Sequence, residues 1–218
     1  MGKGMVVLIT GGNDNGKSEY AEDLVLKLSP NGAQAGFTRL YLATMSARDE
    51  ESLKRIEKHI LRRKDMEYIT IEKSCNIGMI DPVSYRANDP ENDEKDGHTL
   101  FEDNKTDKLD RFILLIEDIP NLLANEMFKG TDFYPDVADK IINDIKKLVS
   151  VCEHTVIVTN EVFSDGMTYD EYTTTYLCEF GKINREVAKF SDKVVELVCG
   201  IPLIIKDSEK SSALLGGQ

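Results

Sequence analysis

The chain has 218 residues, of which 41% are hydrophobic and 30% are charged. This length suits one large α/β domain with a sizeable core, whereas two full domains would each be small. The formal net charge of −12 argues against nucleic acid and anionic membrane surfaces as partners, because neither offers counter-charge to an acidic protein.

The cysteines and the apolar segments bear on the compartment. The cysteines lack C-x-x-C spacing and neighbouring histidines, so we expect reduced thiols rather than a zinc site or a disulfide framework. They are Cys75, Cys152, Cys178 and Cys199. No charged segment with an apolar core opens the chain, and no apolar run approaches the roughly 20 residues that span a bilayer. We therefore expect a cytoplasmic protein without a membrane span.

The clearest motif follows the first apolar run, residues 5–10, and precedes a helix-compatible segment at 19–28. It has the pattern G-x-x-x-x-G-K-S, and a buried strand before it and a helix after it are typical of a phosphate-binding loop. The alternative is a glycine-rich turn with a surface lysine. The motif consists of Gly11, Gly12, Asn13, Asp14, Asn15, Gly16, Lys17 and Ser18.

This loop predicts binding of a nucleoside triphosphate. Backbone N–H groups and the start of the helix would surround the phosphates. Lys17 would reach the outer phosphates, and the Ser18 hydroxyl would bind a Mg²⁺ ion that bridges phosphate oxygens. A second strand is expected at 39–44. Ligands collect at the carboxyl ends of parallel strands, so its end should lie beside the loop. That end consists of Thr44, Met45 and Ser46.

A helix is expected at about 49–63, with apolar residues on one stripe and basic residues on another. The basic stripe consists of Arg55, His59 and Arg62. A histidine flanked by arginines can bind a phosphate or attack one, but an ordinary solvated basic face has the same spacing. Spacing alone leaves both interpretations open.

A third strand is expected at 67–72, before a segment without regular pattern. Residues 81–110 hold ten acids and four bases, which predicts an exposed, partly mobile acidic insertion. The apolar run 111–116 then predicts a central parallel strand. It ends in Glu117 and Asp118, one of which would face the loop and bind Mg²⁺. The alternative is a polar strand end that simply enters a loop.

The rest of the chain alternates between helical and extended patterns. We expect helices at about 121–128, 135–150 and 169–190, and strands at 155–159, 193–198 and 202–206. The sequence thus predicts an α/β, P-loop NTPase-like fold with a mostly parallel sheet flanked by helices and a C-terminal strand pair. We expect residues 1–206 to form a single domain and 207–218 a flexible tail.

Several sequence blocks occur in an order known from one enzyme family. The phosphate loop is generic, but Arg55-Ile56-x-x-His59 followed by Thr159-Asn160-Glu161-Val162 is more specific. With these blocks, most of the chain resembles the bifunctional adenosylcobinamide kinase / adenosylcobinamide-phosphate guanylyltransferase family of cobalamin biosynthesis.

The resemblance implies a two-step enzyme that uses Mg²⁺ with GTP or ATP. The aminopropanol hydroxyl of adenosylcobinamide is phosphorylated first. GMP from GTP then passes through the histidine matching His59 to the cobinamide phosphate, with release of pyrophosphate. The resemblance also implies nucleotide contacts by Arg55, Arg62, Arg63, Glu72 and Glu117, and a homo-oligomer, as a trimer.

Three departures from the family pattern keep alternatives open. Asp14-Asn15 stands where the family has Arg-Ser, Lys64 replaces a proline, and Leu177-Cys178 replaces Arg-Asp. One alternative is a P-loop kinase that lacks the guanylyl step or uses another acceptor. Another is a nucleotide-binding regulatory relative without turnover.

Overall fold

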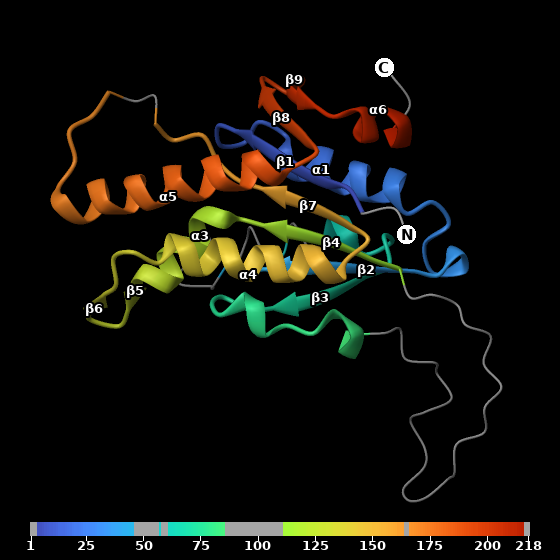
Figure 1. Cartoon of the computed structure of the whole chain (residues 1–218), viewed down its shortest axis with the longest axis horizontal. Helices are drawn as coiled ribbons and strands as arrows, with labels where there is room; N and C mark the ends of the chain where they lie inside the picture. Colours follow the sequence, from blue (N-terminus) through green and yellow to red (C-terminus); the bar gives the residue numbers. More distant parts are fainter. Residues whose placement is uncertain (1–3, 46–56, 58–60, 86–110, 164–165, 216–218) are drawn as a thin grey trace, which may run out of the picture.

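A seven-stranded sheet forms the centre of the computed structural model, with the strand order β3-β2-β4-β7-β1-β8-β9 (Figure 1). The structure describes residues 4–45, 57, 61–85, 111–163 and 166–215. All neighbouring strands are parallel except β8 and β9, which form an antiparallel pair. The strands are β1 (Val6–Gly11), β2 (Phe37–Ala43), β3 (Tyr68–Glu72), β4 (Arg111–Glu117), β7 (His154–Val158), β8 (Lys193–Val198) and β9 (Ile201–Asp207).

Helices cover both faces of the sheet. The helix α1 packs on one face, and α3, α4 and α5 pack on the other, where Figure 1 shows them side by side. The helices are α1 (Lys17–Leu28), α3 (Ile119–Met127), α4 (Ala138–Val151), α5 (Glu171–Phe190) and α6 (Glu209–Leu215), with short 3-10 helices η1 (Gly32–Ala35), η2 (Ile77–Met79) and η3 (Pro82–Tyr85). A two-stranded hairpin of β5 (Phe128–Lys129) and β6 (Asp132–Phe133) follows α3.

The alternation of side chains along β1 explains why its sequence is apolar throughout. Val6 and Leu8 belong to the core under α3, α4 and α5, whereas Val7 and Ile9 belong to the core under α1. A parallel strand that is covered on both faces has no solvent side, so it needs no polar alternation. The mostly parallel sheet predicted from the sequence is confirmed, as is the C-terminal strand pair.

The structure differs from the sequence-based expectations at three places. Residue Asp207 still belongs to β9 and Glu209–Leu215 forms α6, where a flexible tail over 207–218 was expected. Leu215 packs against the core under α1, which explains why this short helix is held. The β5–β6 hairpin was not predicted, and α4 begins at Ala138 rather than near residue 135.

Other expectations fall largely outside the described residues. Of the helix expected at 49–63, only residues 57 and 61–63 are described, and they are helical. In the acidic segment 81–110 the described part contains η3, and residues 86–110 lie outside the description. No helix within the described ranges is long and apolar enough to cross a membrane.

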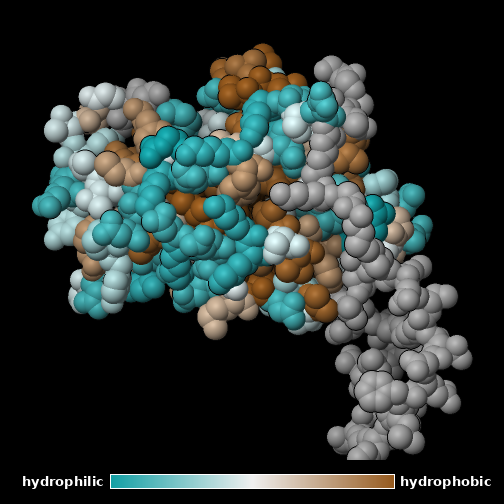
Figure 2. Space-filling view, in the orientation of Figure 1, coloured by the Kyte–Doolittle hydropathy of each residue, from teal (hydrophilic) through white to brown (hydrophobic). Residues whose placement is uncertain are grey.

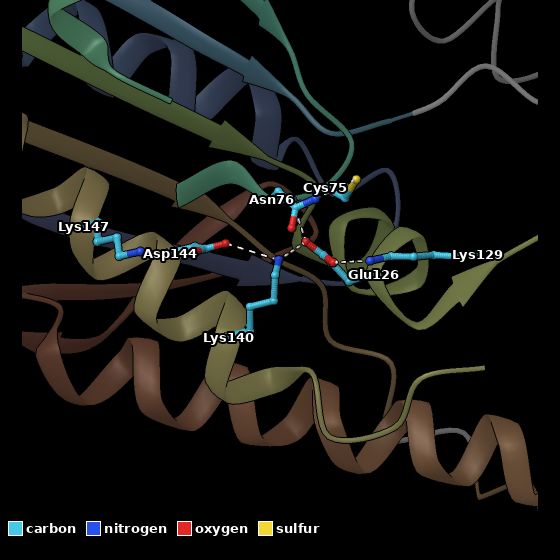
Figure 3. A network of polar contacts seen from close by, with 7 residues as sticks. All are labelled: Cys75, Asn76, Glu126, Lys129, Lys140, Asp144 and Lys147. Atoms are coloured by element: carbon cyan, nitrogen blue, oxygen red, sulfur yellow. Dashed lines mark hydrogen bonds and ion pairs between the residues drawn. The ribbon is translucent and has the colours of Figure 1, made fainter. Parts of the chain in front are cut away.

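A buried carboxylate ties the segment after β3 to the helices on the same face (Figure 3). Glu126 on α3 accepts hydrogen bonds from the Asn76 backbone N–H, at 2.6 Å, and from Lys129, at 3.0 Å. It also accepts one from Lys140 of α4, whose ammonium lies 3.4 Å from Asp144. These contacts hold the segment that begins at the end of β3, beside the edge of the sheet where the strands end.

Candidate nucleotide-binding site

The glycine loop connects the end of β1 to the start of α1, as its sequence predicts. Gly11 has a φ of 143°, and a Cβ there would lie 2.5 Å from the carbonyl oxygen of Leu197 in β8. Gly16 has a φ of 78°, in the left-handed region, immediately before the first residue of α1. Both positions therefore require glycine, because a side chain would be strained at either one and would collide at Gly11.

Lys17 folds back over this loop instead of extending into solvent. Its ammonium donates a hydrogen bond to the carbonyl oxygen of Gly12. Burial lowers the pKa of Lys17, while the carboxylates of Asp118, Asp14 and Glu117 act in the opposite direction. The side chain is thus held across the loop, where a phosphate would offer the cation a stronger partner than a neutral carbonyl.

Asp14 and Asn15, which differ from the loop of the family that the chain resembles, have different environments. Asp14 is exposed and has a φ of 53°. The Asn15 amide donates a hydrogen bond, at 3.3 Å, to the carbonyl oxygen of Leu197. Asn15 therefore fixes the loop to β8, and Asp14 adds a negative charge to its outer surface.

Glu117 is the acid at the end of β4 that faces the loop. Its Oε1 accepts a hydrogen bond from the Ser18 hydroxyl at the start of α1. Asp118 instead caps α3, accepting a hydrogen bond from the Asn121 backbone N–H at 3.1 Å. The strand β7 lies between β1 and β4 in the sheet, so Ser18 and Glu117 meet across the end of an intervening strand.

Hydroxyl and carboxylate oxygens are the ligands that Mg²⁺ prefers. The pair Ser18 and Glu117 therefore fits a Mg²⁺ ion that takes its remaining ligands from phosphate and water. Within the described ranges, no group of three or more histidine, cysteine, aspartate or glutamate residues offers an alternative metal site.

Thr44, at the end of β2, is buried and bound to the protein rather than open to a ligand. Its hydroxyl lies 2.8 Å from the carbonyl oxygens of both Glu117 and Asp118. The Asn125 amide donates to the Thr44 carbonyl oxygen at 2.9 Å. Met45 follows in a half-buried position, and Ser46 lies outside the described residues.

The polar residues that follow β7 also reach the loop. The Asn160 amide donates a hydrogen bond to the Asn13 side chain at 3.3 Å. Thr159 donates at 2.7 Å to Asn184 of α5, which is the contact that holds this segment against the helix. The Asn184 amide also donates to the Asn160 carbonyl oxygen at 3.4 Å, and Asn184 was not among the predicted site residues.

The predicted basic residues divide into two groups. Arg62 forms an ion pair with Glu22 of α1, with its Nε 2.6 Å from Oε2, and Glu22 is only 1% exposed. Arg63 lies buried against Tyr41, with its guanidinium carbon 3.2 Å from the centre of the ring. The other two members of the basic segment, Arg55 and His59, lie outside the described residues.

The register of β3, β2 and β4 determines where Glu72 and Tyr41 lie relative to Glu117. Glu72 pairs with Ala43 of β2, which in turn pairs with Glu117, so the two acids lie in one row across the sheet edge. Tyr41 precedes Ala43 by two residues and thus lies on the same face of the sheet. Its hydroxyl donates a hydrogen bond to Glu117 Oε2. Sequence analysis missed this role for Tyr41, because nothing local distinguishes it from a core residue of the strand.

The fold and the loop define a P-loop nucleotide-binding protein: a parallel strand, a glycine turn and a helix start, with a carboxylate on a neighbouring strand end. Comparison with solved structures finds a KaiC-like protein PH0186 from the hyperthermophilic archaeon Pyrococcus horikoshii OT3. It is 15% identical, with a TM-score of 0.47 and coverage of 95% of this chain and 81% of that one. This likeness is too distant to add to the assignment.

Sequence comparison gives the family. A bifunctional adenosylcobalamin biosynthesis protein, CobU, of Escherichia coli (strain K12) is 26% identical over 213 residues, covering 93% of this chain and all of the relative. The family model for cobinamide kinase / cobinamide phosphate guanyltransferase matches residues 7–205. The chain belongs to this family. Membership confirms the predicted class of enzyme, a kinase and nucleotidyltransferase of cobalamin biosynthesis.

Proposed function

We propose that the chain phosphorylates adenosylcobinamide with ATP or GTP and then transfers GMP from GTP to adenosylcobinamide phosphate through His59. The observation that carries the nucleotide chemistry is the contact between the Ser18 hydroxyl and the Glu117 carboxylate at the start of α1. Phosphoryl transfer depends mainly on positioning and on neutralising phosphate charge, and these two side chains offer a metal site for that purpose.

In the kinase step the loop and its lysine bind the nucleotide. Backbone N–H groups at the start of α1 and the Lys17 ammonium hold the phosphates. Mg²⁺, when bound by Ser18 and Glu117, supplies positive charge to the phosphate oxygens. The acceptor hydroxyl forms a bond to the γ-phosphorus as the bond to the β-phosphate oxygen breaks, and the hydroxyl proton is released.

In the guanylyl step His59 carries GMP. A ring nitrogen forms a bond to the α-phosphorus of GTP, and the bond to the bridging oxygen of the departing pyrophosphate breaks. A phosphate oxygen of the acceptor then attacks the same phosphorus and breaks the phosphorus–nitrogen bond. Support comes from the end of this segment, where Arg62 is bound to α1 and Arg63 is packed against Tyr41. These contacts fix Arg62 against α1 and Arg63 against β2, the two elements that carry Ser18 and Tyr41.

The test is covalent labelling with GTP that is radioactive at the α-phosphate, in the presence of Mg²⁺. We expect an adduct that is lost in acid, survives base and is absent from His59→Ala. Lys17→Ala, as a control in the loop, should lose phosphorylation of adenosylcobinamide. An enzyme that forms no adduct and no nucleotide-dependent product from adenosylcobinamide would contradict the proposal.

A kinase without the guanylyl step is the second candidate function. One feature of the loop favours this candidate: Asp14 is exposed and acidic where the family has an arginine. Asn15, where the family has a serine, is bound to the Leu197 carbonyl oxygen. This candidate predicts that His59→Ala phosphorylates its acceptor at the wild-type rate while no labelled adduct forms in either protein. Loss of kinase activity in His59→Ala would count against it.

Self-association completes the proposal, and β9 offers the surface for it. This edge strand exposes four aliphatic side chains, and Figure 2 shows them as a hydrophobic patch at the top of the molecule. They are Ile201 (62% exposed), Leu203 (47%), Ile204 (50%) and Ile205 (62%). The charged residues that follow have partners within the chain: Lys206 donates to the Ala188 carbonyl oxygen at 3.1 Å, and Asp207 pairs with Lys193 at 3.1 Å.

An apolar edge strand with free backbone groups pairs readily with another strand of the same kind. A second copy of the chain is the partner that we propose for β9, and in a trimer this patch would meet a different surface of the next copy, because a three-fold ring uses heterologous contacts. The hairpin turn at residues 199–200 lies at the carboxyl end of β8, close to Asn15 of the loop. A partner copy seated on β9 would therefore lie beside the phosphate loop.

A further inference from the structure

The two oxygens of the Glu117 carboxylate have different partners. Oε1 accepts a hydrogen bond from the Ser18 hydroxyl, on the side of the phosphate loop. Oε2 accepts a hydrogen bond from the Tyr41 hydroxyl, and the Arg63 Nη1 lies 3.9 Å from the same oxygen. The carboxylate is therefore oriented by one set of side chains and presents its other oxygen to the loop.

Tyr41 is placed for this contact by strand register. It lies on β2, which pairs with β4 so that Tyr41 is opposite Leu115 and Ala43 is opposite Glu117. Its ring is buried and packs edge-on against Tyr68, with the ring centres 6.0 Å apart. A phenol fixed by packing has little freedom to move, so its hydroxyl holds one orientation of the carboxylate.

Arg63 reinforces the same orientation. Its guanidinium stacks on the Tyr41 ring, at 3.2 Å from the ring centre, and the side chain is almost fully buried. Burial lowers the pKa of Arg63, and the nearby carboxylates of Glu117 and Glu22 oppose that effect. The guanidinium is planar, so it can stack on the Tyr41 ring and face the Glu117 carboxylate at the same time.

We infer that Tyr41 and Arg63 are positioning residues: they hold Oε2 of Glu117 so that Oε1 faces Ser18 and the metal ion. The inference rests on the proposed Mg²⁺-dependent nucleotide chemistry and adds two residues to it. Both side chains approach Oε2 of Glu117, through which they would act on the metal ion. Partners that orient a metal ligand typically affect metal affinity or activity by about 10- to 100-fold when they are removed.

The chain offers a matched control in the same cluster. The Tyr68 hydroxyl is also buried, but it finds no hydrogen-bond partner among the described residues. Tyr68→Phe and Tyr41→Phe therefore each remove one buried phenolic oxygen, and only the second removes a contact with Glu117. Deleting an unpaired buried hydroxyl carries no loss of a hydrogen bond.

The experiment measures binding of fluorescent GTP to the full chain during a titration with Mg²⁺, and again in excess EDTA. We expect Tyr41→Phe to require about 10- to 100-fold more Mg²⁺ than wild type. Tyr68→Phe should follow the wild-type curve, and all three proteins should bind equally in EDTA. In turnover assays Tyr41→Phe should lower kcat and leave the KM for adenosylcobinamide unchanged, with recovery at saturating Mg²⁺.

Arg63→Lys is the second variant, which keeps the charge but loses the planar stacking. It should shift the Mg²⁺ titration in the same direction as Tyr41→Phe. If circular dichroism shows that Tyr41→Phe is unfolded, Arg63→Lys still tests the inference. If GTP binding by the wild type does not respond to Mg²⁺, both the proposed function and this inference are contradicted. If the wild type responds to Mg²⁺ and the titrations of Tyr41→Phe and Arg63→Lys match it, the inference is overturned and the proposed function is not.

Discussion

Replacing Glu126 by glutamine removes a buried charge and keeps the shape of the side chain. The carboxylate is 1% exposed and accepts hydrogen bonds from the Asn76 backbone N–H, Lys129 and Lys140 (Figure 3). In Glu126→Gln one of the two oxygens becomes an NH₂ group, which faces donors and can accept nothing. The structure therefore predicts that this conservative change is destabilising.

The magnitude follows from the partners. A hydrogen bond to a charged group contributes about 1.5–3 kcal/mol. The side chains of Lys129 and Lys140 are 43% and 40% exposed, so both ammonium groups regain water when the carboxylate is lost. We expect the free energy of unfolding to fall by about 2 kcal/mol, which lowers Tm by roughly 4–8 °C in a protein of this size.

The dependence on pH gives a second measurement on the same variant. Burial by itself raises the pKa of Glu126, but the hydrogen bonds from Asn76, Lys140 and Lys129 outweigh it and hold the pKa below its ordinary value of 4.5. A lowered folded-state pKa stabilises the protein above the unfolded pKa, and the contribution is lost as the pH falls through the folded value. The difference between wild type and Glu126→Gln should therefore shrink below about pH 4.5.

Urea unfolding followed by circular dichroism at pH 7 and at lower pH checks both expectations. The control is Glu186→Gln on α5, which removes a partly exposed acid whose partner Lys189 is exposed. It should leave the unfolding midpoint unchanged, because exposed ion pairs contribute little. Equal stability of Glu126→Gln and wild type at pH 7, or a deficit that persists unchanged in acid, would refute the reasoning.

Two further predictions concern the loop and the edge strand. Gly11→Ala places a Cβ 2.5 Å from a backbone oxygen of β8 at a φ of 143°, so it should abolish binding of fluorescent GTP. Gly200 has a φ of 80°, and a Cβ there would meet no atom within 4 Å. Gly200→Ala should therefore retain GTP binding and lower the stability by about 1–2 kcal/mol. Ile205→Lys on β9 should convert an oligomer to a monomer in light scattering, whereas an unchanged mass would place the interface elsewhere.

Much of the fold was readable in the sequence because its signals are local. The central parallel strands are continuous apolar runs, and each lies within two residues of its predicted position. The phosphate loop is a contiguous motif between a strand and a helix, so its position required no tertiary information. The α6 helix was missed because its short, mostly small and polar sequence resembles a loose end, whereas tertiary packing buries Ser211 and places Leu215 against the core.

The arrangement around Glu117 depended on contacts that no local pattern contains. Alternation required that only one of Glu117 and Asp118 face the loop, but it could not say which. Ser18 and Glu117 are 99 residues apart in the chain, and Tyr41 and Glu117 are 76 apart. Their meeting depends on the order of the strands and on the register of β2 against β4.

The sequence by itself therefore determined the class of fold, the loop that would hold a nucleotide and the family to which the chain is similar. The tertiary structure decided which acid faces that loop and which side chains orient it. The physical reason is that short-range signals come from neighbours along one strand or helix. The orientation of a carboxylate is set by partners from other strands, which only the assembled sheet brings within hydrogen-bonding distance.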